Sequence, residues 1–220
     1  MDYQIGVVAH VKRQKQMNYL SETIHPELIE PDDGTLGAAG NHLTTLMALR
    51  RKNSHAWAVV MEDDAQPVDG FREQVDAALS VAPSGVVSFY MGTGYPAQYQ
   101  GAFTEALKLD TCWLMHPQLR HGVCYAIAPD IQKALLIRME KLVSDKFAPD
   151  DAIGKWCMEN RVSVAYSNPS LVDHEDGQTV VDYRFHLGHV SPPGRNRPRK
   201  AYKVGTRVTW DDSSVIVGAR

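Results

Sequence analysis

Trp57-Ala-Val-Val-Met-Glu-Asp-Asp-Ala65 is an apolar segment that runs directly into three consecutive carboxylates. Its first five residues have the length and apolar character of a buried strand, and such strands normally end in Gly, Asn or a turn. Glu62, Asp63 and Asp64 repel one another unless a cation or the hydroxyl groups of a ligand neutralise them. Because Mg²⁺ and Mn²⁺ prefer carboxylate oxygens, the segment predicts a strand that brings acids to a ligand site. An acidic turn that caps the next helix is the alternative.

Apolar segments and helical patterns alternate on both sides of this strand. The expected strands cover residues 5–9, 57–61, 85–91, 122–128 and 162–166, and the expected helices cover 37–51, 71–82, 129–142 and 149–156. Such alternation predicts an α/β fold with a mostly parallel sheet flanked by helices. Residues 95–120 contain scattered glycines, prolines and aromatic residues, and we expect them to be irregular.

Composition sets the class of protein. With 220 residues, 44% of them hydrophobic and 22% charged, the chain is typical of a soluble globular protein with one large domain. No apolar run approaches the ~20 residues of a membrane span, and the first residues lack the pattern of a secretory signal. The cysteines lie in apolar stretches without metal-ligand spacing, which predicts reduced core residues of a cytoplasmic protein.

Positive charge is concentrated near the end of the chain. The net charge is −3, but residues 184–220 hold eight Lys or Arg against two Asp, so residues 1–183 carry −9. A change of composition near His189 predicts a domain of residues 1–188 and a basic arm of residues 189–220. Within this arm, residues 204–217 suggest a small β-hairpin.

The basic arm has two interpretations. It is a solvated surface segment, or it holds a polyanionic acceptor such as nucleic acid or an anionic glycan, in which case binding weakens with salt. For the second interpretation the acceptor-binding candidates are Arg195, Arg197, Arg199 and Lys200.

Further polar residues fall at the ends of predicted elements. Lys12 and Arg13 follow the first strand, His42 lies near the start of a helix where backbone N–H groups favour anions, and Asp150-Asp151 open another helix. His174 follows the last strand. Each has a simpler explanation, namely a solvated loop, a helix residue bonded to a carbonyl, helix caps or a surface histidine. Because an open α/β sheet collects ligand-binding ends at one edge, we expect these residues to lie together.

In this order the segments resemble the family 25 group of lipopolysaccharide-type galactosyltransferases, which are nucleotide-sugar-dependent enzymes of the GT-A fold. The Glu-Asp-Asp triplet after its apolar strand carries most of the resemblance, which covers residues 3–176. The matched segments are residues 37–42, 59–65, 122–127 and 149–151.

The resemblance implies roles for individual residues. Asp64 and His174 would hold Mn²⁺ or Mg²⁺, which offsets charge on the departing diphosphate. Asp151, with Asp150 second, would be the base that deprotonates the acceptor hydroxyl of an inverting enzyme. The residues expected to bind the nucleotide-sugar donor are Glu62, Asp63, His10, Lys12, Arg13 and His42. The acceptor would be a glycan, a protein or nucleic acid with a hydroxylated base.

Two other functions fit parts of the sequence. Clustered carboxylates at a strand end also suit metal-dependent phosphoryl transfer or hydrolysis. A non-catalytic nucleotide- or nucleic-acid-binding module is the other alternative, in which the acids are turn residues and the basic arm binds.

Overall fold

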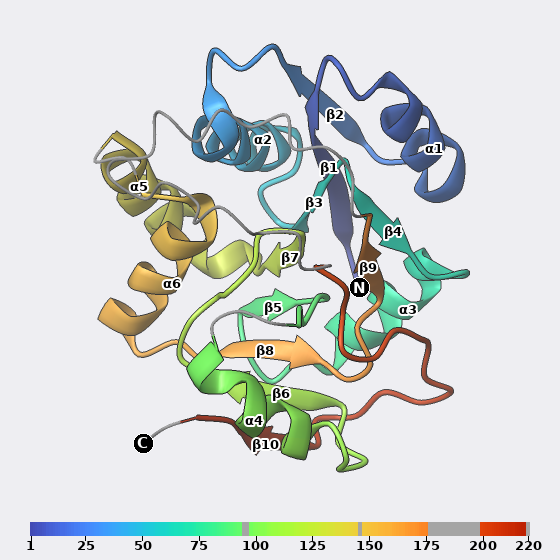
Figure 1. The fold of residues 1–220 in the computed structure, drawn as a ribbon. Coiled ribbons are helices and arrows are strands. Elements are labelled where there is room, and N and C mark those ends of the chain that lie inside the picture. Colours follow the sequence, from blue (N-terminus) through green and yellow to red (C-terminus); the bar gives the residue numbers. More distant parts are fainter. Residues whose placement is uncertain (94–96, 145–146, 176–198, 219–220) are drawn as a thin grey trace.

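A computed structural model describes residues 1–93, 97–144, 147–175 and 199–218 (Figure 1). Eight strands form one mixed sheet in the order β10-β6-β8-β5-β7-β3-β1-β2. They are β1 (Tyr3–His10), β2 (Leu28–Asp32), β3 (Trp57–Glu62), β5 (Val86–Ser88), β6 (Trp113–His116), β7 (Cys124–Ile127), β8 (Val164–Ser167) and β10 (Ser214–Ile216). The pairs β1–β2, β1–β3, β5–β8 and β6–β10 are parallel, whereas β7 runs antiparallel to β3 and β5, and β6 to β8.

Helices cover both faces of the sheet. They are α1 (Gln14–Ile24), α2 (Gly37–Lys52), α3 (Phe71–Ser80), α4 (Ala97–Ala106), α5 (Pro129–Ser144) and α6 (Pro149–Asn160). Helices α1 and α3 pack on one face, in a core with Phe71 and Trp113, while α2, α4, α5 and α6 pack on the other, in a core with Leu46 and Trp156. The chain therefore has the predicted α/β class, a mostly parallel mixed sheet flanked by helices, and its arrangement is compatible with a Rossmann-like fold.

Strand β1 lies between the edge strand β2 and strand β3. It pairs with β2 and β3, and all its residues between the two ends are buried, as in a strand covered on both faces. Gly6 is required here because a Cβ at this position would lie 2.7 Å from Thr45 Cγ2 of α2. This close approach brings the start of α2 to the end of β1, beside the end of β3.

A second, two-stranded sheet crosses the end of β3. Strand β4 (Ala65–Pro67) pairs antiparallel with β9 (Val172–His174), and Ala65 lies opposite His174. The amide of Glu175 donates to the carbonyl of Asp64 at 2.8 Å, which extends this pairing by one step. His174 is thereby carried from a distant part of the sequence to the acidic triplet.

The elements expected around residues 37–51, 71–82, 129–142 and 149–156 are confirmed, but the expectation of irregular structure at 95–120 is wrong. That stretch contains α4 and β6. Helix α4 contains Gly101, which weakens the helical pattern, and buries only a narrow face, with Phe103 and Ala106 inward. Strand β6 is four residues long, and its partners β8 and β10 come from far along the chain, so local pattern does not show it.

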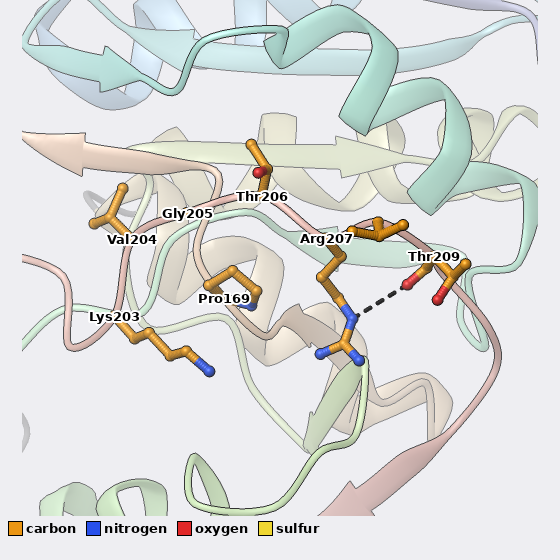
Figure 2. Close-up of a pocket in the computed structure, with 8 residues that line it drawn as sticks. Pro169, Lys203, Val204, Gly205, Thr206, Arg207 and Thr209 are labelled. Carbon is orange, nitrogen blue, oxygen red and sulfur yellow. Dashed lines mark hydrogen bonds between the residues drawn. The ribbon is translucent and has the colours of Figure 1, made fainter.

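The described residues up to 218 pack against β6 and α3, in the segment where a hairpin was expected. Its strand β10 joins β6 in parallel, and the described residues before β10 form no antiparallel partner for it. The Trp210 ring lies 5.3 Å from the Trp113 ring, centroid to centroid, and the Trp210 indole donates to Gln74 of α3. A hollow of about 420 Å³ lies beside this segment, lined by Pro169 and residues 203–209 (Figure 2). Burial against β6 and α3 stabilises the segment more than a solvated two-stranded hairpin would.

The helices in the described ranges are all too short or too polar for a bilayer crossing.

Candidate functional site

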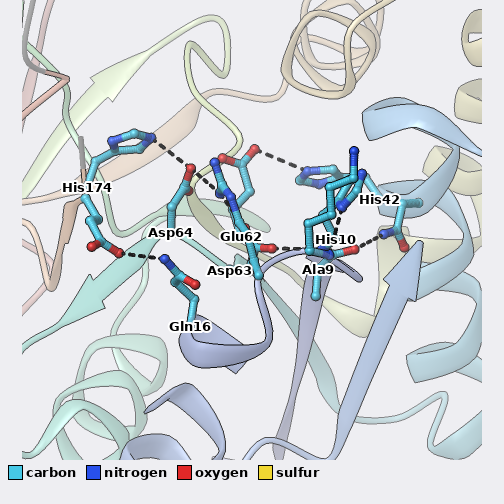
Figure 3. A network of polar contacts seen from close by, with 12 residues as sticks. Ala9, His10, Gln16, His42, Glu62, Asp63, Asp64 and His174 are labelled. Atoms are coloured by element: carbon cyan, nitrogen blue, oxygen red, sulfur yellow. Dashed lines mark hydrogen bonds and ion pairs between the residues drawn. The ribbon is translucent and has the colours of Figure 1, made fainter. Parts of the chain in front are cut away.

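Strand β3 brings the acidic triplet to one edge of the sheet. Its neighbours fix the backbone there, because the amide of Glu62 donates to Val123 at 2.9 Å and that of Asp63 donates to Val8 at 3.0 Å. Asp63 and Asp64 are buried, and Glu62 is partly exposed. Figure 3 shows the row of polar side chains that results, from His174 through the acids to His42.

Asp63 uses both carboxylate oxygens within the protein. Oδ2 accepts from the backbone amide of His10 at 2.8 Å, and Oδ1 accepts from the guanidinium of Arg13 at 2.6 Å. Burial raises the pKa of Asp63, and the Arg13 charge offsets only part of that effect. Asp63 therefore holds the loop after β1 to the end of β3.

Asp64 has a different environment. Oδ2 lies 2.7 Å from Arg13 and 3.4 Å from His174 Nε2, whereas Oδ1 is buried and accepts no hydrogen bond from the described residues. Burial alone would raise the pKa of Asp64, but His174 and then Arg13 lower it to about 2. The carboxylate is thus held ionised, with one oxygen still able to accept a ligand.

Glu62, Asp64 and His174 form a candidate metal centre. One ligand atom from each lies within 4.8 Å of the others, and the described ranges contain no second cluster of this kind. Two carboxylates and one imidazole can bind a divalent cation, and these ligands do not by themselves select one metal. The buried Asp64 Oδ1 accepts no hydrogen bond from the described residues, and a cation at this place would remove the cost of leaving it without a partner.

His42 lies behind Glu62. Its Nε2 is 3.3 Å from Glu62 Oε1, its Nδ1 is 3.1 Å from the Tyr125 hydroxyl, and the residue is fully buried. A Cβ at Gly122 would lie 3.0 Å from Glu62 Oε1, so the glycine leaves room for this carboxylate. His42 was expected to face an anion at the start of α2; it supports Glu62 from behind.

The two acids that open α6 differ in exposure. Asp151 is exposed and Asp150 is partly buried. Burial, followed by the charges of Glu62 and Asp150, raises the pKa of Tyr125. Burial, followed by the charges of Asp151 and Glu62, raises the pKa of Asp150 to about 7. The charge of Glu62, a member of the candidate metal centre, therefore acts on the partly buried Asp150.

The basic candidates separate into three groups. Arg13 forms ion pairs with Asp63 and Asp64. His10 is partly buried, and its Nδ1 accepts a hydrogen bond from the backbone amide of exposed Lys12 at 3.1 Å. The side chain of Lys200 donates to the His174 carbonyl at 2.8 Å, and the Arg199 carbonyl accepts from the Tyr90 hydroxyl. Arg195 and Arg197 lie outside the described residues.

Several contributors were not predicted from the sequence. Asp32 ends β2, which no pattern indicated, and its two oxygens accept the amides of Gly34 and Leu36 at the approach to α2. Tyr125, in β7, reaches His42 through strand pairing, whereas Lys200, which was expected to bind an acceptor, contacts the His174 carbonyl. For Asp32 the local signal is weak, because only Leu28 and Ile29 are apolar and Glu30-Pro31 stand between them and Asp32.

No model of a known protein family matches the chain, and no curated protein matches it. Function is therefore inferred from the side chains and their geometry.

Proposed function

We propose that the protein is a divalent-metal-dependent glycosyltransferase of the GT-A fold, which moves a sugar from a nucleotide-sugar donor to an acceptor hydroxyl. The observation that carries the proposal is the convergence of Glu62, Asp64 and His174 at the end of β3. Open α/β sheets bind ligands at the carboxyl ends of their strands, and the acidic triplet lies at such an end.

In this proposal Asp64 and His174 hold Mn²⁺ or Mg²⁺, and Glu62 assists. A bound cation supplies charge that offsets the negative charge developing on the diphosphate leaving group. The low pKa of Asp64 keeps it ionised over the whole working range of pH.

The donor would lie over the ends of β1 and β3. Arg13 already bridges Asp63 and Asp64 at 2.6 and 2.7 Å, so its guanidinium is fixed where a diphosphate would approach. A guanidinium binds phosphate oxygens in a planar, two-pronged fashion. Lys12 in the loop after β1 and His10 at the end of β1 are additional donor-binding candidates. His42 contributes by holding Glu62 from behind.

Asp150 is assigned as the general base. The acceptor oxygen forms a bond to the anomeric carbon while the bond from that carbon to the diphosphate oxygen breaks, and the acceptor proton passes to Asp150. Attack from the side opposite the leaving group inverts the anomeric centre. A base with a pKa of about 7 is deprotonated in a useful fraction near neutral pH and still basic enough to accept a proton.

A second reaction class, two-metal phosphoryl transfer, receives less support. Such sites hold two ions ~3.5–4 Å apart and need carboxylates or histidines for both. The described residues supply one cluster of three ligands.

The test is a panel of nucleotide sugars incubated with the protein and Mn²⁺, with release of nucleoside diphosphate as the readout. We expect release from at least one donor, abolished by EDTA and by Asp64→Asn. Asp69→Asn, an exposed acid of the same segment, is the matched control and should keep full activity. Release that continues in EDTA, or in Asp64→Asn, would overturn the proposal.

A further inference from the structure

The segment 199–205, which we name the C-terminal strap, lies beside the loop that follows β5. The amide and hydroxyl of Thr93 both donate to the Lys200 carbonyl at 2.8 Å, and the amide of Tyr202 donates to Met91 at 3.0 Å. Gly92 and Ala201 form an isolated antiparallel bridge. The strap therefore forms short backbone pairings with residues 91–93, which follow β5.

On its other side the strap contacts the segment that leads into β9. The amide of Ser170 donates to the Lys203 carbonyl at 2.9 Å, and the amide of Gly205 donates back to Ser170 at 3.1 Å. The strap is therefore held between residues 90–93 and residues 170–174. Tyr90 links the two sides, because its hydroxyl donates to Arg199 and its ring centroid lies 6.4 Å from that of His174.

The contacts converge on the backbone that carries His174. Lys200 Nζ donates to the His174 carbonyl at 2.8 Å and lies 3.3 Å from Asp173 Oδ2. The amide of Ala201 donates to Asp173 Oδ1 at 2.8 Å. The two residues of the strap thus hold two successive residues of β9 through a carbonyl and a carboxylate.

Strand β9 needs such support. It is three residues long, and its partner in the described residues is β4, which is equally short. An isolated two-stranded pair is marginally stable in water. A metal ligand, in contrast, must be held within ~0.5 Å of its working position by the residues around it.

We propose that the C-terminal strap is part of the metal site, with Lys200 as a positioning residue that fixes His174 toward Asp64 and so sets the affinity for Mn²⁺. This inference rests on the proposed function, which assigns His174 as a ligand. It replaces the expectation that Lys200 binds an acceptor, because its ammonium group is already committed to the His174 carbonyl and to Asp173.

The test is Mn²⁺ binding by the full chain without nucleotide, measured by electron paramagnetic resonance of free Mn²⁺. Lys200→Met keeps the apolar stem and removes the ammonium group. We expect its Kd for Mn²⁺ to rise about 10- to 100-fold, the usual effect of losing a partner that orients a metal ligand. Lys203→Met, an exposed position of the same strap, should bind Mn²⁺ like the wild type.

A variant at Arg207 distinguishes an effect on the position of His174 from a general loss of stability. Arg207 donates to Asn168 at 3.1 Å and to Asp110 at 2.8 Å, away from His174. Arg207→Met should lower the Tm in EDTA and leave the Kd for Mn²⁺ unchanged, whereas Lys200→Met should raise the Kd with a smaller loss of Tm. If Lys200→Met does not fold, Asp173→Asn takes its place, since it weakens the same contact, and the same rise in Kd is expected.

The outcomes are distinguishable. Equal Mn²⁺ affinity of the wild type and a folded Lys200 or Asp173 variant would overturn this inference and leave the metal centre intact. Absence of Mn²⁺ binding by the wild type would overturn the metal assignment and the inference together.

Discussion

Two aspartates near the same edge of the sheet have the same chemistry and opposite environments. Asp64, after β3, lies against Arg13 and His174, and these neighbours lower its pKa to about 2. Asp150, at the start of α6, lies near Asp151 and Glu62, and burial with these charges raises its pKa to about 7. Environments that move the pKa values of two carboxylates apart in this way suit one of them to be an ionised ligand and the other to accept a proton. In the proposed function, the neighbouring charges of each aspartate, more than its position in the sequence, decide its role.

Loss of the ionised partner should have the largest effect. Asp64→Asn keeps the shape of the side chain but removes its charge and much of its ability to bind a cation. Turnover of the nucleotide sugar should fall by more than the ~10²–10³-fold that one electrostatic contact contributes. Initial rates at saturating Mn²⁺ measure the effect. Wild-type rates in this variant would remove Asp64 from the centre.

Loss of the proton acceptor should come next. Asp150→Asn should lower kcat for transfer by ~10²–10⁴-fold, while donor affinity is retained. Asp151→Asn is the matched control on the adjacent, exposed position and should change kcat little. Transfer kinetics of the two variants, with donor binding by calorimetry, separate the roles. A larger loss in Asp151→Asn would restore the order expected from the sequence.

The ion pairs of Arg13 with Asp63 and Asp64 test how charge is balanced around Asp64. The Arg13 guanidinium and both carboxylates are largely buried, so removing one partner leaves uncompensated charge. Arg13→Met should lower the free energy of unfolding by ~3–5 kcal/mol in EDTA. Mn²⁺ should recover part of that loss, because a cation bound to Asp64 replaces the missing charge. Denaturant titrations with and without Mn²⁺ give both values, and a loss that Mn²⁺ does not reduce would argue against a cation at Asp64.

The pH dependence tests the Asp150 side. Transfer needs the deprotonated carboxylate, so kcat should rise with pH and level off above about 7. Because the folded pKa exceeds the ordinary value of 3.8, the folded state holds a proton that the unfolded chain has released between these values. The stabilising contribution of Asp150 is therefore complete at low pH and lost as pH rises through about 7. The free energy of unfolding of Asp150→Asn, from denaturant titrations without metal, should not show this loss. The same pH dependence of that free energy in the wild type and the variant would contradict the assignment.

On the Asp64 side of the comparison, the sequence predicted the strand and the position of the acids. An apolar run that ends in three acids is a local pattern, and the structure has the strand and the acids in that place. The resemblance to a family named His174, which the β4–β9 pairing brings to Asp64. The order expected from the sequence, Asp151 before Asp150, stays a prediction, because neighbouring residues of one type carry no signal for which of them is buried.

The remaining differences come from long-range pairing. Strands β2, β6 and β10 have three to five residues, and each is fixed by partners that local periodicity does not reveal. Lys200 belonged to a basic run that fitted a solvated arm or an acceptor site. Its contact with His174 depends on the return of the chain over β9, and composition carries no information about that path.

The most direct test of the central claim is a Mn²⁺ titration of the wild type, Asp64→Asn and Asp150→Asn. If Asp64 is the ligand and Asp150 the base, the wild type and Asp150→Asn bind one Mn²⁺ per chain with similar affinity, and Asp64→Asn loses it. Binding by Asp64→Asn at wild-type affinity, or its loss in Asp150→Asn alone, would contradict the division of roles between the two aspartates.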